Sequence, residues 1–298
     1  MSPLVVRFLQ AASESAAFEV ARDLGVVEVR GADREKWLNG LVTCDVLKSQ
    51  AGKVSYGLVV GRTGKMQADV RIVREPERLL LVVPASTRDE LLATFDRHLI
   101  MEDVELAPLA KKVVLGSGPQ ALERIAHVEA KASFDRTGQG GVLAIVDEAA
   151  IATRDQVVDG EEGEGALALR LRHGIAKWGV DFDTTLYPHE ASLEKVAVSF
   201  DKGCYLGQEV VCMVELRGQV KRKLALLDLD APTQEGARVY SQEGVDIGDI
   251  RSHAVTPDGN RAIALVKVAF AEPNRVLEVG LEGAPRTPAR VLTLCGRV

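Results

Sequence analysis

Short runs in which apolar and polar residues alternate recur in the first half of the chain, and this pattern predicts β-strands. Strands are expected at residues 26–29, 54–60, 66–73, 79–83, 104–109, 113–115 and 142–146. Apolar residues at helical spacing predict a helix from Ser13 to Leu24, and further helices are expected to begin at Asp33, Ser86 and Pro119. Strands, hairpins and helices that form no regular β-α-β units predict an α+β fold.

The pattern changes after Arg222, where the expected strands become short and closely spaced. They cover residues 224–229, 238–240, 245–250, 262–270, 276–279 and 290–294, separated by Gly and Pro turns. This spacing is typical of a small β-barrel. We therefore divide the chain into a body at residues 1–222, of one or two subdomains, and a C-terminal barrel at residues 223–298. Within the body, residues 166–173 could form a helix or a strand, and residues 159–165 are expected to form a mobile acidic loop.

Length and charge narrow the class of protein. The chain has 298 residues and a net charge of −6, with only a short basic strip at Lys221–Lys223. The broad basic surface of a nucleic-acid-binding protein is therefore not expected. No apolar run reaches the length of a membrane span, and the N-terminus has no signal-peptide pattern, so we expect a cytoplasmic protein. Four scattered cysteines without a C-x-x-C motif favour a reducing compartment and argue against a metal site.

Candidate chemistry is concentrated in the octet Lys202-Gly203-Cys204-Tyr205-Leu206-Gly207-Gln208-Glu209. A nearby lysine favours the reactive thiolate form of Cys204, and Gly203 and Gly207 allow unusual backbone angles and the close approach of a ligand. The apolar pair Val210–Val211 predicts that the octet leads into a buried strand. The alternative is that Cys204 is a small buried residue and that the glycines only form a turn.

The octet resembles the K-G-C-[YF]-x-G-Q-E signature of the YgfZ-type folate-binding proteins, which are relatives of the glycine-cleavage T-protein. A second segment, Gly31 to Val46, resembles the family's G-x-D-x-x-x-[FWY]-[LM]-[QN]-G-x-[VL]-T-x-D motif. Two further segments, Leu169–Ile175 and Tyr187–Ala191, are similar to the family's L-x-[IL]-E-A-G and P-x-E-A motifs. The resemblance extends over essentially the whole chain.

The resemblance implies a T-protein-like folate-binding body around a central cavity, with a C-terminal β-barrel. It implies a protein that supports iron–sulfur cluster assembly or repair, with linked tRNA modification, and whose partners are assembly proteins or client enzymes. Cys204 and Lys202 are the expected reactive residues. Tetrahydrofolate is the expected cofactor, in a cavity walled by strand 66–73 and the octet. The residues expected to contact it are Asp69, Glu190, Tyr205, Gln208, Glu209 and Arg222.

The chain departs from the family pattern at two positions that bear on folate. Ala68 replaces the first of two adjacent acids in the T-proteins, and Arg172 replaces the glutamate that binds the pterin ring. A guanidinium has no acceptor for the pterin N–H groups, so weaker folate binding is expected. Two other functions remain open: an interaction module that has lost folate, and a folate-dependent aminomethyltransferase. We expect a monomeric accessory protein rather than a glycine-cleavage enzyme.

Overall fold

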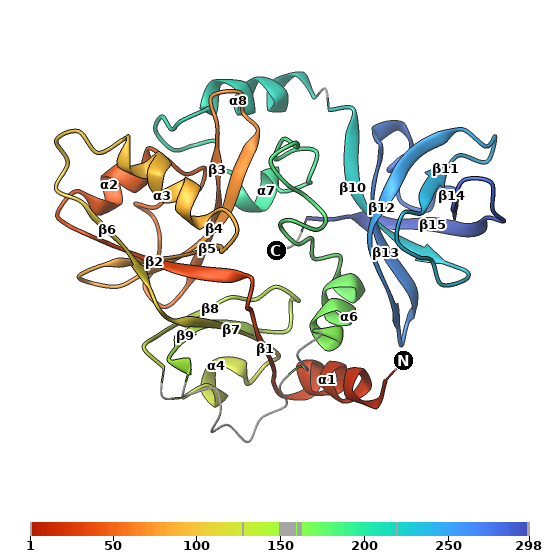
Figure 1. Cartoon of the computed structure of the whole chain (residues 1–298), viewed down its shortest axis with the longest axis horizontal. Helices are drawn as coiled ribbons and strands as arrows, with labels where there is room; N and C mark the ends of the chain where they lie inside the picture. The colour runs from red at the N-terminus through yellow and green to blue at the C-terminus, as the bar shows by residue number, and fades with distance from the viewer. Residues whose placement is uncertain (1, 127, 149–158, 160–162, 219, 297–298) are drawn as a thin grey trace.

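The computed structural model describes residues 2–126, 128–148, 159, 163–218 and 220–296. Two antiparallel sheets form the body, and a closed barrel forms the C-terminal part of the chain (Figure 1). The predicted α+β fold with a C-terminal barrel is therefore confirmed.

The larger sheet of the body has five strands in the order β3-β4-β5-β2-β6. Their bounds are β2 Leu24–Arg30, β3 Val54–Val60, β4 Met66–Arg74, β5 Leu79–Pro84 and β6 Glu105–Leu109. Alternate residues of these strands face opposite sides of the sheet. One side, with Ala68, Val70 and Ile72 of β4, packs in a core with residues of helices α2 (Arg34–Asn39) and α3 (Arg88–Asp96). The other side faces the centre of the body.

The smaller sheet has the order β1-β7-β9-β8. Its strands are β1 Ala17–Val20, β7 Lys112–Ser117, β8 Ala130–Ser133 and β9 Gly141–Val146. Residues of β7, β8 and β9 join the central core, which also contains residues of β2, β3, β4 and β5. The short helix α4, Ala121–Arg124, packs in a separate cluster with the opposite faces of β7 and β9. The two sheets thus enclose the centre of the body between them.

The prediction of a helix from Ser13 to Leu24 is wrong. Helix α1 runs from Pro3 to Glu14 instead, with Ser2 as its N-cap, and Ala17–Val20 then forms β1. The buried face of α1 contains Val5, Phe8, Leu9 and Ala12 at helical spacing. Local pattern alone favoured a later helix because Ala17 and Phe18 are apolar, but pairing with β7 holds them in a strand.

The secondary structure of two other segments of the body could not be decided correctly from the sequence. Residues 166–173 belong to helix α6, Glu164–His173, which contacts α1. The octet leads into helix α8, Gln208–Arg217, and not into the expected strand. Of the acidic loop expected at residues 159–165, residues 160–162 lie outside the described residues, whereas Glu164 and Gly165 already belong to α6, so the loop prediction is wrong for these two. A short helix α7, Glu194–Ala197, precedes the octet.

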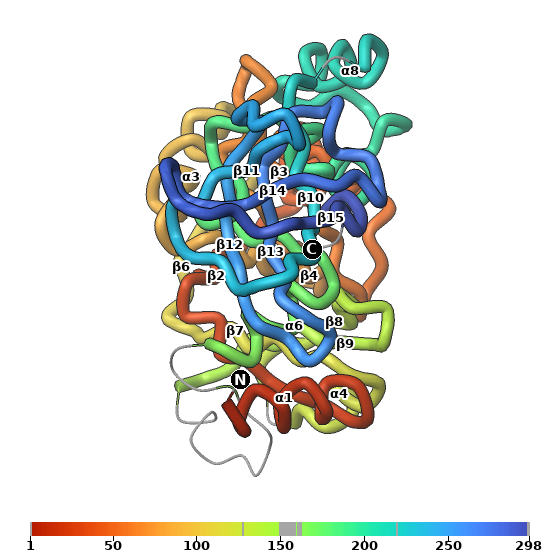
Figure 2. Tube along the Cα trace, turned by 90° about the vertical axis from the view of Figure 1, so that its right-hand side faces the viewer, coloured from red at the N-terminus to blue at the C-terminus, as the bar shows by residue number. Residues whose placement is uncertain are grey.

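The barrel is built from strands in the order β10-β13-β12-β11-β14-β15 (Figure 2). Their bounds are β10 Arg222–Leu229, β11 Arg238–Tyr240, β12 Asp246–Thr256, β13 Gly259–Lys267, β14 Val276–Gly280 and β15 Thr287–Leu294, and a 3-10 turn η1 covers Val268–Phe270. Along β10, Leu224 and Leu226 pack in the central core, whereas Leu227 and Leu229 pack inside the barrel. The first barrel strand is buried on both faces, so apolar packing joins the barrel to the body.

Candidate functional site

Hydrogen bonds hold the octet against the segment Gly31–Val46, although about 160 residues of chain separate the two. Lys202 is buried, and its ammonium group donates hydrogen bonds to the carbonyl oxygens of Asn39 at 2.6 Å, Val42 at 2.7 Å and Cys44 at 2.8 Å. The backbone N–H of Leu206 donates to the carbonyl of Gly40 at 3.0 Å. Burial lowers the pKa of Lys202 to about 8, and the three carbonyl dipoles take the place of the water that the ammonium has lost. Lys202 therefore holds the two motifs together, and its influence on the Cys204 thiol stays a prediction.

Gly207 is required where the octet meets the turn of the β3–β4 hairpin. Its φ is +79°, and a Cβ at this position would collide with the carbonyl oxygen of Gly61. Gly64 in the same turn has a φ of +76°, and a Cβ there would lie 2.7 Å from Val210 of α8. Both positions require glycine, because the backbone is left-handed and the two segments are in close contact. Gly203, in contrast, has open space around it.

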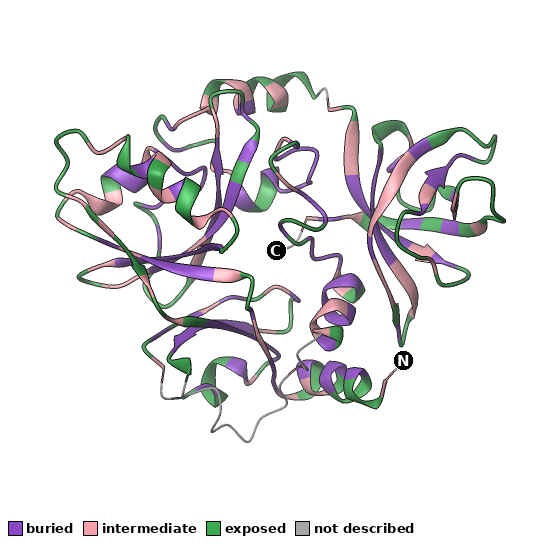
Figure 3. Ribbon diagram, viewed as in Figure 1, coloured by how far each residue is buried: buried purple, intermediate pink, exposed green. Residues whose placement is uncertain are grey.

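This packing exposes the sulfur-bearing part of the octet and buries its aromatic residue. Cys204 is exposed, whereas Tyr205 is only 7% exposed and packs in the central core. Gln208 begins α8, and Glu209 in its first turn is exposed. Helix α8 lies at the edge of the molecule (Figure 3). Val211 is its only fully buried residue, and Met213 and Leu216 on this helix are exposed. The octet is therefore a rigid surface platform that displays Cys204.

The other three cysteines are placed differently. Cys44 is buried, and burial raises the pKa of its thiol to about 11. Cys295 is also buried, and its pKa is raised well above the usual range for the same reason. Cys212 is half-buried on α8, the helix that stands where the pair Val210–Val211 predicted a strand. Cys204 is the only exposed cysteine of the four.

A cavity of about 510 Å³, partly open to solvent, lies in the body. Residues of β1, β4, β7 and α6 line it, together with the segment after α6. The apolar part of the wall includes Leu115, Leu167 and Trp178, and cationic side chains include Arg71, Arg136 and Arg170. Its volume lies within the range of small-molecule sites.

Asp69 lies in the wall of this cavity, as the resemblance implied for a folate contact. Its side chain is only 1% exposed, and its Oδ2 accepts hydrogen bonds from the Tyr56 hydroxyl at 3.0 Å and from Arg71 Nη2 at 2.8 Å. Burial and the neighbouring carboxylate raise the pKa of Tyr56, so its hydroxyl stays protonated and donates. Within the described residues, the second oxygen of Asp69 and two nitrogens of Arg71 have no hydrogen-bond partner. The wall thus contains three buried polar atoms without a hydrogen-bond partner, and the Arg71 guanidinium also lies over the Tyr56 ring, 5.3 Å from its centroid.

Arg71 and Trp178 are cavity residues that the sequence reasoning missed. A signal for Arg71 was present, because residues two apart on a strand face the same side and a charged residue there stands among Val70, Ile72 and Val73. No local signal marks Trp178, which follows helix α6 in the chain and is brought to the cavity by the tertiary fold.

The remaining residues expected at folate are not brought to this cavity. Glu190 accepts a hydrogen bond from the backbone N–H of Tyr187 at 3.1 Å and lies 3.6 Å from Arg222 Nε. Neither Glu190 nor Arg222 lines the cavity, and none of the octet residues does so. The expectation that strand 66–73 and the octet wall one common cavity is therefore wrong: the strand contributes Asp69 and Arg71, while the octet packs against the hairpin turn and the segment from Asn39 to Cys44.

Arg172 also lies away from the cavity. Its Nε lies 2.6 Å from Asp258 in the turn between β12 and β13. The neighbouring Arg170 does line the cavity, and it pairs with buried Asp181 at 2.6 Å. Asp181 also accepts a hydrogen bond from Ser252 of β12 at 2.5 Å, so this buried network connects the cavity wall to the barrel.

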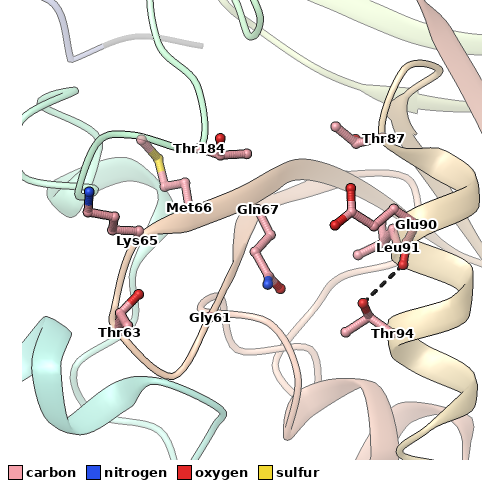
Figure 4. A pocket seen from close by; sticks show the side chains of 10 residues that line it. All are labelled: Gly61, Thr63, Lys65, Met66, Gln67, Thr87, Glu90, Leu91, Thr94 and Thr184. Atoms are coloured by element: carbon pink, nitrogen blue, oxygen red, sulfur yellow. Dashed lines mark hydrogen bonds between the residues drawn. The ribbon is translucent and has the colours of Figure 1, made fainter.

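A second pocket, of about 330 Å³, lies between the β3–β4 hairpin and α3 (Figure 4). Thr63, Lys65 and Gln67 come from the hairpin side, and Thr87 and Thr94 come from the helix side. None of the buried polar atoms that lack a partner in the described part of the chain belongs to this pocket. This pocket therefore has fewer features of a ligand-binding site than the central cavity.

Two other features are absent from the described residues. No group of three or more His, Cys, Asp or Glu side chains in them could hold a metal ion. No helix in that same portion has the length and apolar character that a membrane crossing requires.

Comparison with known proteins agrees with the fold and the motifs. Residues 4–140 match the family model described as the GCVT N-terminal domain. The tRNA-modifying protein YgfZ of Escherichia coli O157:H7 (strain EC4115 / EHEC) is 28% identical over 86% of this chain and 87% of its own. The YgfZ protein of Escherichia coli O7:K1 (strain IAI39 / ExPEC) is 27% identical with the same coverage. The glycine cleavage system aminomethyltransferase T from Bartonella henselae has a similar fold, with a TM-score of 0.84, 19% identity and coverage of 98% of this chain and 90% of that one.

These findings place the chain in the class of proteins with the glycine-cleavage T-protein fold. Within that class, the chain is similar to the YgfZ proteins over most of its length, and it carries the octet that resembles their signature.

Proposed function

We propose that this protein is a folate-binding accessory protein of the cytoplasm, which supports the assembly or repair of iron–sulfur clusters and, through them, tRNA modification. The observation that carries this proposal is the display of Cys204 by the octet. Lys202, Leu206 and Gly207 fix the loop, and Cys204 remains exposed. Because these contacts hold the loop around one accessible thiol, they support a chemical or binding role for the sulfur.

Tetrahydrofolate is the proposed ligand of the central cavity. The volume of about 510 Å³ and the unpaired atoms of Asp69 and Arg71 support this proposal, because a ligand with donors and acceptors would satisfy them. When bound, a tetrahydrofolate supplies the ring nitrogen N5 and the exocyclic nitrogen N10, which can carry a one-carbon group. Asp69 and Arg71 would bind and orient it, and Leu115 and Trp178 would exclude water from its ring.

The proposed partners are iron–sulfur assembly proteins or the client enzymes that contain such clusters. Cys204 would meet them at the surface, next to the exposed side chains of Met213 and Leu216 on α8. In this proposal the protein acts as a monomer, and it does not bind nucleic acid directly, since the net charge of −6 gives no attraction for phosphates.

Two observations bear on the alternative functions. The octet lies outside the cavity, which favours an interaction module over a folate enzyme whose loop works on its ligand. A folate-dependent aminomethyltransferase has less support, because Ala68 replaces one acid and the carboxylate of Asp69 already accepts hydrogen bonds from Tyr56 and Arg71.

A complementation assay tests the proposal. A bacterial strain without its own YgfZ-type protein would receive the wild type, Cys204→Ser or Cys212→Ser, and activity of an iron–sulfur-dependent tRNA-modifying enzyme would be measured. Cys212→Ser is the matched control, because it removes a half-buried thiol eight residues away. We expect loss of activity with Cys204→Ser alone. Full complementation by Cys204→Ser, at equal protein levels, would overturn the proposed role of the sulfur.

A further inference from the structure

The wall of the central cavity contains an acceptor and donors side by side, and these atoms have no partner in the described residues. Asp69 Oδ2 and Arg71 Nη2 are joined at 2.8 Å, which holds the two side chains together. The remaining oxygen, Asp69 Oδ1, is buried and unpaired, and so are Arg71 Nε and Nη1. Both residues lie on the same side of β4, because they are two positions apart.

Unpaired atoms of this kind are rare in folded proteins. The large majority of buried polar side-chain atoms have a hydrogen-bond partner, and exceptions call for a specific explanation. Here three exceptions come from two touching side chains that line one cavity. A ligand in the cavity would supply the missing partners.

The chemistry of the two side chains defines what that ligand must present. An ionised carboxylate only accepts hydrogen bonds, and a guanidinium only donates them. The complement is an N–H donor next to an acceptor oxygen. A lactam edge, which has a ring N–H beside a carbonyl, presents this pair in a fixed geometry.

We propose that Asp69 and Arg71 bind the lactam edge of a heterocyclic ligand, with the ring N–H donating to Asp69 Oδ1 and the neighbouring carbonyl oxygen accepting from Arg71. This inference rests on the proposed function where the heterocycle is the pterin of a folate. It assigns ring recognition to the β4 pair, in a chain whose Arg172 is turned toward Asp258. Guanine carries the same edge, so the chemistry has two sources that an experiment must separate.

Calorimetry with matched ligands tests the assignment. Folic acid would be compared with 3-methylfolic acid, which lacks the lactam N–H, and guanosine with 1-methylguanosine. The wild type should bind the unmethylated member of a pair at least tenfold more tightly. The variants Asp69→Asn and Arg71→Gln should bind that member about tenfold or more weakly. They should leave the methylated member nearly unchanged, because its methyl group, in place of the N–H, holds the whole lactam edge, carbonyl included, away from both side chains.

Lys177→Met is the matched control. Lys177 also lines the cavity, but its ammonium pairs with Asp23 at 3.1 Å and is not part of the β4 pair. It should retain the preference between methylated and unmethylated ligands. Circular dichroism would check that each variant is folded, and Arg71→Gln keeps the test open should Asp69→Asn fail to fold.

The outcomes distinguish the assignment of the lactam edge from folate binding itself. Tight binding of folic acid with a preference that survives both β4 variants would overturn the lactam assignment and leave folate binding intact. Binding of guanosine but not of folic acid, with the preference lost in the variants, would support the assignment and overturn folate as the ligand. Binding of neither would overturn both.

Discussion

The ammonium nitrogen of Lys202 lies 2.7 Å from the carbonyl oxygen of Val42, a residue 160 positions earlier in the chain. This hydrogen bond, with the two from the same nitrogen to Asn39 and Cys44, ties the octet to the last residue of α2 and to the loop that follows this helix. The platform that displays Cys204 is therefore built from both ends of the body. Its stability and its chemistry can be tested separately.

Replacing Lys202 with Met should destabilise the protein. The substitution leaves three carbonyl groups without the donor that they share, and an unsatisfied buried polar group costs about 1–3 kcal/mol. We expect the free energy of unfolding, measured by urea titration, to fall by about 2–4 kcal/mol. Lys195→Met, at an exposed position on α7, is the control and should change it by less than about 0.5 kcal/mol. Equal effects of the two substitutions would contradict the structural role of Lys202.

The two octet glycines should respond differently to alanine. Gly207→Ala introduces a Cβ at a φ of +79° and against the carbonyl of Gly61, so we expect a loss of about 1–3 kcal/mol of unfolding free energy. Gly203→Ala meets open space and should be close to neutral. The two urea midpoints, measured in parallel, check this. A Gly203 variant as unstable as the Gly207 variant would mean that the loop is packed differently.

The four thiols should react with iodoacetamide in a defined order in the native protein. Cys204 should react first because it is exposed, and Cys212 should follow more slowly. Burial raises the pKa of Cys44 to about 11, so only about one thiol in a thousand is ionised there at pH 8, and the thiolate fraction grows as the pH rises toward 11. Cys295 should be protected in the same way. Timed labelling with mass-spectrometric mapping measures the order. Faster labelling of Cys212 than of Cys204 would contradict the exposed position of Cys204 on the octet.

Restoring the family's acid with Arg172→Glu should not tighten folate binding. The side chain at position 172 contacts Asp258 and does not line the cavity, so the new carboxylate would face another carboxylate. The dissociation constant for tetrahydrofolate should change by less than about threefold, with Arg172→Gln as the uncharged control. Tightening by tenfold or more would show that residue 172 reaches the ligand, and the placement of α6 would have to be revised.

The sequence was sufficient for the elements that local pattern decides. The barrel strands were predictable because β10 and its neighbours alternate between two buried faces and end at Gly and Pro turns. The strands that contain Asp69 and Val54 were also correctly placed. Pattern failed at Ala17–Val20, where pairing with β7 overrides an apparent helix, and at Val210–Val211, where an apolar pair lies on a helix of the surface.

The candidate site was only partly predictable for a different reason. Family motifs marked Asp69 and Cys204, but they did not indicate that these residues belong to separate places, because this depends on how β4 and the octet pack. Arg71 was visible as a charge on an apolar strand. The role of Lys202 could not be seen, since its three partners are backbone carbonyls that any sequence would provide.

The central claim is that folate binds in the cavity at Asp69 while Cys204 acts elsewhere on the surface. The most direct measurement is calorimetric titration of tetrahydrofolate into the wild type, Cys204→Ala and Asp69→Asn. We predict the same affinity for the wild type and the Cys204 variant, and a loss of about tenfold or more for the Asp69 variant, the value of one hydrogen bond to a charged group. No binding by the wild type, or a loss of affinity in Cys204→Ala equal to that in Asp69→Asn, would contradict the account.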